Sequence, residues 1–108
     1  MYARVTTAKV RPGKAEEVTK FFIDINTEKK NKAKGFRAAR LLFDRKTNKA
    51  ISISIWETEA DMNAGRDSPE VVKRYGDAGI DVSSLVTETF ENVALVLSQA
   101  PAGPVPQK

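Results

Sequence analysis

Few side chains in this sequence are suited to catalysis, because both histidine and cysteine are absent. Without histidine a serine triad has no usual base, and without cysteine there is no thiol nucleophile and no cysteine-ligated zinc or iron–sulfur site. The groups that remain for proton transfer or for holding a substrate anion are Tyr75, Arg40, Asp44, Glu88 and Glu91. A substrate phenol held by Tyr75 or Arg40 could be oxidised through its own anion, whereas surface ion pairing explains the acidic residues equally well.

Charged clusters raise the question of ligands other than a small organic molecule. The basic run at residues 29–34, followed by Arg37 and Arg40, could contact phosphates, but it is interleaved with aromatics only at Phe36 and is typical of a solvated helix end. The acidic groups at 57–61 and 77–81 lack a glycine-bracketed loop of regularly spaced oxygen ligands. No G-x-G-x-x-G or G-K-[ST] pattern occurs. We therefore predict no nucleic-acid partner, no metal site and no cofactor.

Length and composition describe one small folded domain. The chain has 108 residues, of which 41% are hydrophobic and 30% charged, enough for one core and too hydrophobic for a disordered chain. The first residues lack the basic and long apolar regions of an export signal, and no apolar run approaches the length of a membrane span. We expect a cytoplasmic protein without a membrane partner. The net charge of +4 more often reflects solubility than an anionic partner.

The first half of the chain predicts a strand, a helix and a hairpin. Residues Tyr2–Val10 are rich in Val and Thr and stop before Pro12-Gly13, which favours a strand. Apolar residues at i, i+3, i+4 and i+7 then predict a helix that packs on a sheet and ends in a left-handed cap at Gly35. That apolar stripe consists of Val18, Phe21, Phe22 and Ile25. Residues Phe36–Asp44 and Lys49–Trp56, joined by a polar turn, predict a hairpin.

The second half predicts a broken helix and a last strand. Thr58 with Asp61 is typical of a helix start, and Ser68-Pro69 starts a second helical piece. After a loop at 79–83, Val86–Leu97 predicts the fourth strand. The fold is therefore α+β, a ferredoxin-like βαββαβ domain with a four-stranded antiparallel sheet and two helices on one face. We place the domain at 1–98 and a proline-rich tail at 99–108.

The alternation of the third strand separates two faces of the sheet. The face with Ile51, Ile53 and Ile55 is assigned to the core, and the face with Ser52, Ser54 and Trp56 to the opposite side. The first and last strands carry apolar residues on both faces, which requires cover on both. Two helices cover only one face, so we expect a second copy of the chain to cover the other, giving a homodimeric α/β barrel. The alternative is a monomer with one wet face.

Between two such sheets we expect an apolar cavity that accepts a small hydrophobic or aromatic molecule. The residues predicted to bind it are Arg40, Ser52, Ser54, Met62 and Phe90, with Trp56 and Tyr75 as candidate catalytic residues. The two candidate catalytic residues also have a structural explanation. A tryptophan at a strand end commonly anchors packing, and a tyrosine on a helix is commonly a buried or rim aromatic.

Four short motifs, by their order and spacing, give the sequence a resemblance to the antibiotic biosynthesis monooxygenase family over roughly residues 2–97. They are Pro12-Gly13-Lys14 before the first helix, Gly35-Phe36 at the second strand, Trp56-Glu57-Thr58-Glu59-Ala60 at the end of the third, and Asp67-Ser68-Pro69 in the second helix. The resemblance implies a dimeric α/β barrel. It also implies, for many members, an oxygen-dependent oxidation of a polyaromatic or quinol substrate without metal or flavin.

The catalytic positions of this family hold other residues here. Quinone-forming relatives have an asparagine four positions before the strand tryptophan and a tyrosine six positions after it, where this chain has Ser52 and Met62. The asparagine, tryptophan and iron-ligating histidine of haem-degrading relatives correspond to Thr6, Gly65 and Tyr75. The resemblance therefore carries over Trp56 but neither catalytic set, and it predicts no haem.

Three functions remain open at this point. The first is a cofactor-independent monooxygenase acting on a small aromatic or quinol-type substrate in an apolar pocket. The second is a non-catalytic dimeric domain of the same fold that binds a small molecule. The third is a basic interaction domain that uses the lysine-rich helix end.

Overall fold

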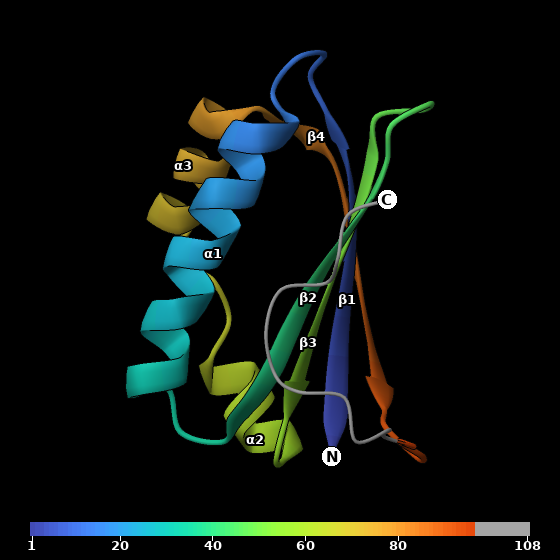
Figure 1. Cartoon of the computed structure of the whole chain (residues 1–108). Coiled ribbons are helices and arrows are strands. Elements are labelled where there is room, and N and C mark those ends of the chain that lie inside the picture. Colours follow the sequence, from blue (N-terminus) through green and yellow to red (C-terminus); the bar gives the residue numbers. More distant parts are fainter. Residues whose placement is uncertain (97–108) are drawn as a thin grey trace.

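The computed structural model describes residues 1–96, which form a four-stranded antiparallel sheet with three helices on one side (Figure 1). The elements are β1 (Tyr2–Val10), α1 (Ala15–Lys32), β2 (Phe36–Asp44), β3 (Lys49–Trp56), α2 (Glu59–Ala64), α3 (Pro69–Ala78) and β4 (Ile80–Glu91). The predicted ferredoxin-like α+β fold is confirmed. The predicted boundary at residue 98 and the tail 99–108 lie outside the described residues.

The sheet has the order β2-β3-β1-β4, so the first strand of the chain lies in its interior. Tyr2 is paired with Trp56 on β3 and with Glu91 on β4. The Val, Thr and Ile content of β1 and β3 suits such paired positions. Side chains paired across antiparallel strands share a face, so this register decides which residues point toward the helices.

Helix α1 packs on the sheet through the predicted apolar stripe. Val18 and Ile25 are buried, and Phe21 and Phe22 are partly buried. Val18 joins a core that also contains Ala8, Val10, Ala50 and Ile80. The helix has glutamates in its first turn and lysines in its last, which complements the helix dipole. It ends at Lys32, three residues before the left-handed Gly35, whose φ is 77°.

The second helical region is broken as predicted, and each piece has its own N-cap. The Thr58 hydroxyl accepts a hydrogen bond from the Asp61 amide, and the Ser68 hydroxyl accepts one from the Val71 amide. Pro69 occupies the first turn of α3, where its missing N–H costs nothing. The break leaves a short link at residues 65–68 that faces α1.

The prediction for the last strand is wrong by six residues at each end. Strand β4 begins at Ile80, directly after Gly79, whose φ of 139° makes the turn that a loop at 79–83 was expected to make. The polar first residues of β4 still pair with β1, with a shift in register between Thr7 and Lys9. At this shift the Ser84 hydroxyl accepts a hydrogen bond from the Lys9 amide. The strand ends at Glu91, so the apolar residues 93–96 are not part of it.

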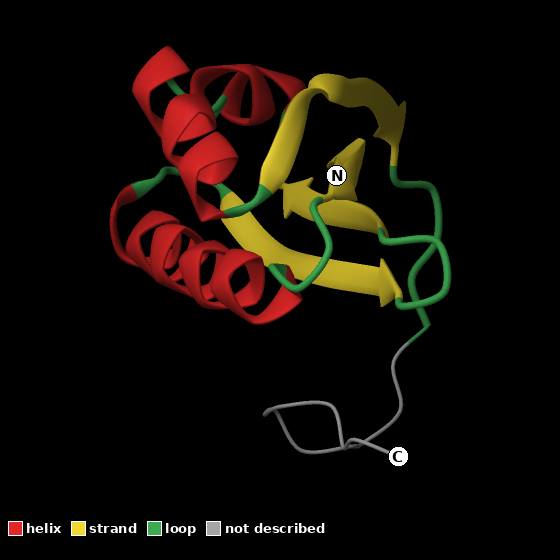
Figure 2. Cartoon of the chain, turned by 90° about the horizontal axis from the view of Figure 1, so that it is seen from above, coloured by secondary structure: helices red, strands yellow, loops and turns green. Residues whose placement is uncertain are grey.

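The two faces of β3 are the reverse of the prediction. Ser52 lies opposite Thr6 and Leu41 and faces the helices, together with Ser54 and Trp56. Ile51, Ile53 and Ile55 lie on the side of the sheet that no helix covers in the described part of the chain (Figure 2). Alternation separates two faces of a strand but does not say which of them meets the helices.

Candidate functional site

A cavity of about 520 Å³ lies between the helix-facing side of the sheet and helices α1 and α3. Its floor is made by alternate residues of the strands, including Thr6, Ser52 and Thr87, and its walls by Val18 and Phe22 of α1 and by Val72 and Tyr75 of α3. A smaller recess of about 40 Å³ continues past Asn26 and Ser54. The lining is mainly apolar with a few polar groups, a composition typical of sites for organic ligands.

The structure brings together some of the residues predicted to form a site. Ser52 and Tyr75 line the main cavity, and Ser54 lines the recess. Trp56 and Met62 are fully buried beside it rather than in its lining. The expectation that this group faces a partner's sheet is wrong, because its neighbours are the helices of the same chain.

Arg40 and Phe90 lie elsewhere. Arg40 is paired with Ile53 and Phe90 with Ala3, so both are on the uncovered face of the sheet. Arg40 is exposed, and Phe90 has 49% of its side-chain surface exposed. The prediction that they share one pocket with Ser52 and Ser54 is therefore wrong. It failed because the uncovered face was taken as the side of the pocket.

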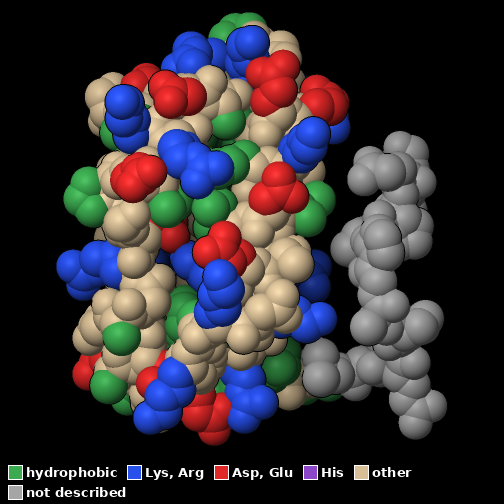
Figure 3. Space-filling view, turned by 90° about the vertical axis from the view of Figure 1, so that its left-hand side faces the viewer, with side chains coloured by type: hydrophobic (Ala, Val, Ile, Leu, Met, Phe, Trp, Pro, Cys, Tyr) green, Lys and Arg blue, Asp and Glu red, His purple; other side chains and the backbone are tan. Residues whose placement is uncertain are grey.

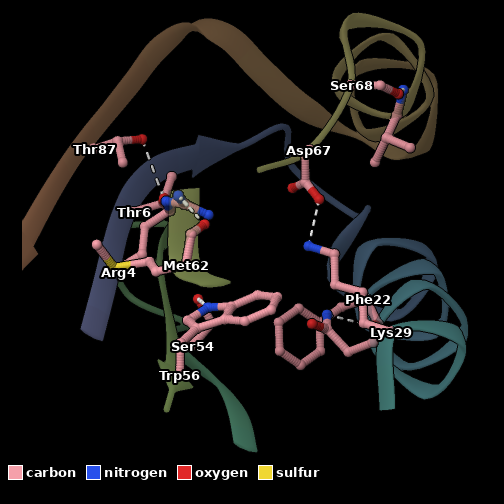
Figure 4. A network of polar contacts seen from close by, with 12 residues as sticks. Arg4, Thr6, Phe22, Lys29, Ser54, Trp56, Met62, Asp67, Ser68 and Thr87 are labelled. Atoms are coloured by element: carbon pink, nitrogen blue, oxygen red, sulfur yellow. Dashed lines mark hydrogen bonds and ion pairs between the residues drawn. The ribbon is translucent and has the colours of Figure 1, made fainter. Parts of the chain in front are cut away.

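Trp56 is the packing anchor at the end of the site where β3 meets α2. Its indole N–H donates to the Ser54 hydroxyl at 3.0 Å (Figure 4). Its ring also packs edge-on against Phe36, with 5.2 Å between the ring centroids. A β-carbon at Gly65 would collide with the outer edge of the indole. The indole thus fills the space that the glycine leaves free, and it supports the cavity without lining it.

Tyr75 is the one phenol in the cavity wall. Its ring packs edge-on against Phe21 at 4.6 Å. Burial, reinforced by the charge of Asp67 and opposed by a hydrogen bond with Asn26, raises the pKa of the phenol above its ordinary value. The Tyr75 phenol is therefore neutral at physiological pH, and it acts as a hydrogen-bonding group rather than as a base.

Arg4 is the functional candidate that the sequence analysis missed. It lies on β1, and its side chain is drawn into the cavity, where one terminal nitrogen donates to the backbone oxygen of Met62 at 2.7 Å (Figure 4). Burial and the charge of Arg66 lower the pKa of the guanidinium, against an opposing effect of Asp67. The available signal was its position on the same side of the strand as Thr6 and Ala8.

An ion pair closes the side of the cavity nearest α1. The Lys29 ammonium donates to the Asp67 carboxylate at 2.5 Å, and both side chains are at most one-third exposed. Figure 4 shows the pair reaching across the gap between α1 and the link 65–68. Lys29, the first lysine of the basic run at 29–34, is therefore largely shielded from solvent and already paired. On the helical side, basic and acidic side chains are interspersed (Figure 3).

Residues 1–96 offer little support for metal binding or for a membrane span. No three acidic side chains gather closely enough there to hold a metal ion. None of the described helices combines the length and the hydrophobicity that crossing a membrane requires. What the cavity offers a ligand is apolar surface, five hydroxyl-bearing strand or helix residues and two arginines. The hydroxyl groups are those of Thr6, Ser52, Tyr75, Thr87 and Thr89.

Comparison with known proteins agrees with the fold. The family model described as antibiotic biosynthesis monooxygenase matches residues 1–73. No curated protein matches the sequence significantly.

Among solved structures, ActVA-Orf6, a monooxygenase of Streptomyces coelicolor in complex with nanaomycin D, superposes with a TM-score of 0.71 at 16% identity, covering 91% of this chain and 92% of that one. SnoaB, a cofactor-independent oxygenase from Streptomyces nogalater, has a TM-score of 0.67 at 17% identity, covering 90% and 97%. The protein NE2512 of Nitrosomonas europaea, of unknown function, has a TM-score of 0.69 at 19% identity, covering 94% and 95%. At these identities the superpositions establish a shared fold.

Proposed function

Because the chain belongs to the antibiotic biosynthesis monooxygenase family, we propose that it oxidises a small aromatic or quinol-type molecule with O₂ and without metal or flavin. The observation that carries the proposal is the cavity of about 520 Å³ between sheet and helices, whose size and mainly apolar lining suit a flat organic molecule. Its polar groups come from the strands, from the link at residues 65–68 and from α3, an arrangement that orients a ligand from several sides.

The proposed reaction needs no external reductant. At a ring methylene of an anthrone-type substrate, two C–H bonds break, one oxygen atom of O₂ becomes the new carbonyl oxygen, and the other leaves with both hydrogens as water. The electrons that reduce O₂ come from the substrate, most readily from its phenolate or enolate. The protein's part is to exclude water, hold the ring and stabilise that anion.

The residues supporting this role are Tyr75, Thr6 and Ser52. The neutral Tyr75 phenol donates a hydrogen bond to a substrate oxygen, and the hydroxyls of Thr6 and Ser52 contact the ring's polar edge from the floor of the cavity. Trp56 acts indirectly, because it is buried and holds Ser54 through its indole N–H.

Oxygen uptake tests the proposal directly. Dihydroquinones and hydroxyanthrones are supplied to the purified protein with a metal chelator present, and O₂ consumption and quinone formation are measured. We expect turnover by the wild type and a roughly 10- to 100-fold lower kcat/KM in Tyr75→Phe, the loss of one hydrogen bond made in the transition state. Arg45→Gln, in the exposed hairpin turn outside both the cavity and the uncovered face, is the control and keeps wild-type kinetics. Absence of turnover with every member of the panel would refute the proposal.

Binding without turnover is the second candidate, and one observation favours it. The described part of the cavity lining has a single carboxylate, Asp67, and that group is engaged by Lys29. A site without a free base suits a domain that binds an aromatic metabolite and leaves it unchanged. Calorimetric binding of the same panel without O₂ consumption would support this candidate.

We also propose that the uncovered face of the sheet is the contact surface of a homodimer. It presents Ile51, Ile53, Ile55, Leu42, Val86 and Phe90, and the last three are 43–57% exposed. An apolar sheet face of this kind is stable in water only when covered. A second copy, related by a two-fold axis, presents the same surface and completes a barrel.

A further inference from the structure

The charges around the cavity do not balance. Three basic side chains, Arg4, Lys29 and Arg66, line the main cavity or its recess, against the one carboxylate of Asp67. Asp67 is bound to Lys29 at 2.5 Å, so its charge is already compensated. No carboxylate among residues 1–96 lies within ion-pairing distance of either arginine. The two guanidinium groups therefore face the cavity with their charges unpaired.

The guanidinium of Arg4 is placed to hold a ligand. It is half-buried on β1, and the hydrogen bond to the Met62 oxygen fixes its position through one terminal nitrogen. A guanidinium carries five N–H donors in a planar fork, so most of them remain available on the cavity side. Arg66 is exposed at the cavity's edge, and the repulsion from its charge adds to the effect of burial in lowering the pKa of Arg4. An anion between them would relieve that repulsion.

From this arrangement we infer that the ligand is an aromatic acid, whose carboxylate binds to Arg4 and Arg66 while its ring system occupies the apolar part of the cavity beside Phe22 and Tyr75. This inference rests on the proposed function, because it names the class of molecule that the same cavity accepts. A carboxylate suits the planar fork of Arg4, since the two groups form parallel N–H···O hydrogen bonds. The acid group is separate from the ring carbon that reacts with O₂.

Hydrogen bonding alone does not account for these arginines. The bond to the Met62 oxygen requires one donor, which a neutral side chain also supplies, and it gives no reason for a second positive charge at Arg66. Burying a charge is unfavourable unless a partner compensates it, and no carboxylate among residues 1–96 forms an ion pair with the half-buried Arg4. A ligand carboxylate is that partner.

The experiment compares two ligands that differ only in charge. A hydroxyanthrone bearing a ring carboxylate and its methyl ester are titrated calorimetrically at neutral pH without O₂, and O₂ uptake is measured separately. We expect the acid to bind roughly 10- to 100-fold more tightly than the ester, the range of a charge-assisted hydrogen bond. Binding of the acid, but not of the ester, weakens as salt is raised.

Three variants locate the effect. Arg4→Gln keeps a donor for the Met62 oxygen and loses the preference for the acid, and Arg66→Gln loses part of it, with both variants retaining the affinity for the ester. Arg45→Gln removes a charge from the exposed hairpin turn and leaves both affinities unchanged. Because Arg66 is exposed, its variant stays informative if Arg4→Gln folds poorly.

The outcomes separate this inference from the proposed function. Equal binding of acid and ester overturns the inference, and so does a preference for the acid that survives both Arg4→Gln and Arg66→Gln. Oxidation of both compounds at equal rates also overturns the inference, but it leaves the proposed function intact. A preference for the acid that depends on the arginines, without any O₂ uptake, supports the inference and overturns the proposed reaction. Failure to bind either compound overturns both.

Discussion

The partly buried phenol of Tyr75 matters both for the chemistry of the cavity and for the stability of the protein. Tyr75 is shielded by α1 and lies near Asp67, and both features favour its neutral form. The phenol is therefore a hydrogen-bond donor over the whole physiological range. Ionisation begins only in strongly alkaline solution, at a pH above that of an unfolded tyrosine.

The first prediction follows from the sign of this shift. Below the ordinary tyrosine pKa of about 10, the phenol is protonated in both the folded and the unfolded state, and pH has no effect through it. Above about pH 10 the unfolded chain releases the proton while the folded protein retains it, so the free energy of unfolding falls, by up to about 1.4 kcal/mol per pH unit. Urea denaturation from about pH 9 to about pH 11 measures this slope.

Tyr75→Phe is the matched control for that titration, because it keeps the ring and removes the proton. We expect its free energy of unfolding to decline less steeply with pH over the same range. Identical slopes for the variant and the wild type would contradict the assignment of a raised pKa to Tyr75.

At this scale the sequence allowed part of the cavity lining to be predicted. Ser52 and Ser54 line the cavity or its recess, although their face of the strand was expected to meet a partner's sheet, and Tyr75 lines the cavity from the helix. Arg4 was not identified, because an arginine on a strand usually projects into solvent. Its inward direction depends on which face of β1 meets the helices, and that is a tertiary fact.

Among the elements, β4 shows most clearly where pattern fails. The prediction followed the apolar run from Val86 onward. The strand instead starts at Ile80, and the residues that follow include the polar Asp81, Ser83 and Ser84. Pairing with the interior strand β1 outweighs the weak strand preference of Asp81 and Ser83. The hairpin of β2 and β3, whose polar turn and alternating residues are local signals, was predicted with its observed bounds.

The second prediction concerns the contact between the end of α2 and the end of β3. Gly65→Ala places a methyl group against the Trp56 indole, although the φ of Gly65, −86°, suits alanine. The cost is therefore steric alone, about 1–3 kcal/mol of unfolding free energy for overpacking a filled space. Chemical denaturation followed by circular dichroism measures it.

A double variant tests whether the indole is the obstacle. Trp56→Phe together with Gly65→Ala is expected to lose less stability than the sum of the two single variants, because the smaller ring leaves room for the methyl group. Gly76→Ala is the control, since there the nearest side-chain atom, a methyl of the exposed Val82, can shift. Additive losses would show that some other contact carries the cost.

For the whole molecule, the two faces of the sheet have different surroundings. The helices cover one face of the sheet (Figure 2), and the cavity lies between that face and the helices. The other face carries exposed apolar side chains, among them Leu42, Val86 and Phe90. The sequence predicted cover for both faces and placed the cavity on the face that no helix covers. The cavity of the structure is instead formed by one chain, and the proposed partner would bury the opposite face.

The third prediction tests the proposed dimer. Ile53→Glu puts a charge at the centre of the uncovered face and is expected to reduce the sedimenting mass from that of two chains to that of one. Ile23→Glu, on the outer side of α1, where the side chain is 55% exposed, leaves the mass unchanged. A wild type that sediments as a single chain at tens of micromolar would contradict the proposal.

The position of β1 also has a consequence for how the protein is made. The first strand of the chain pairs on one side with β3 and on the other with β4, with Tyr2 opposite Glu91. During synthesis, one edge of β1 therefore stays unpaired until the last strand has left the ribosome, and an open strand edge pairs readily with other chains. The long sequence separation of that pairing also slows folding. Chains interrupted before residue 80 lack the strand that closes this edge and are expected to aggregate rather than accumulate as a folded fragment.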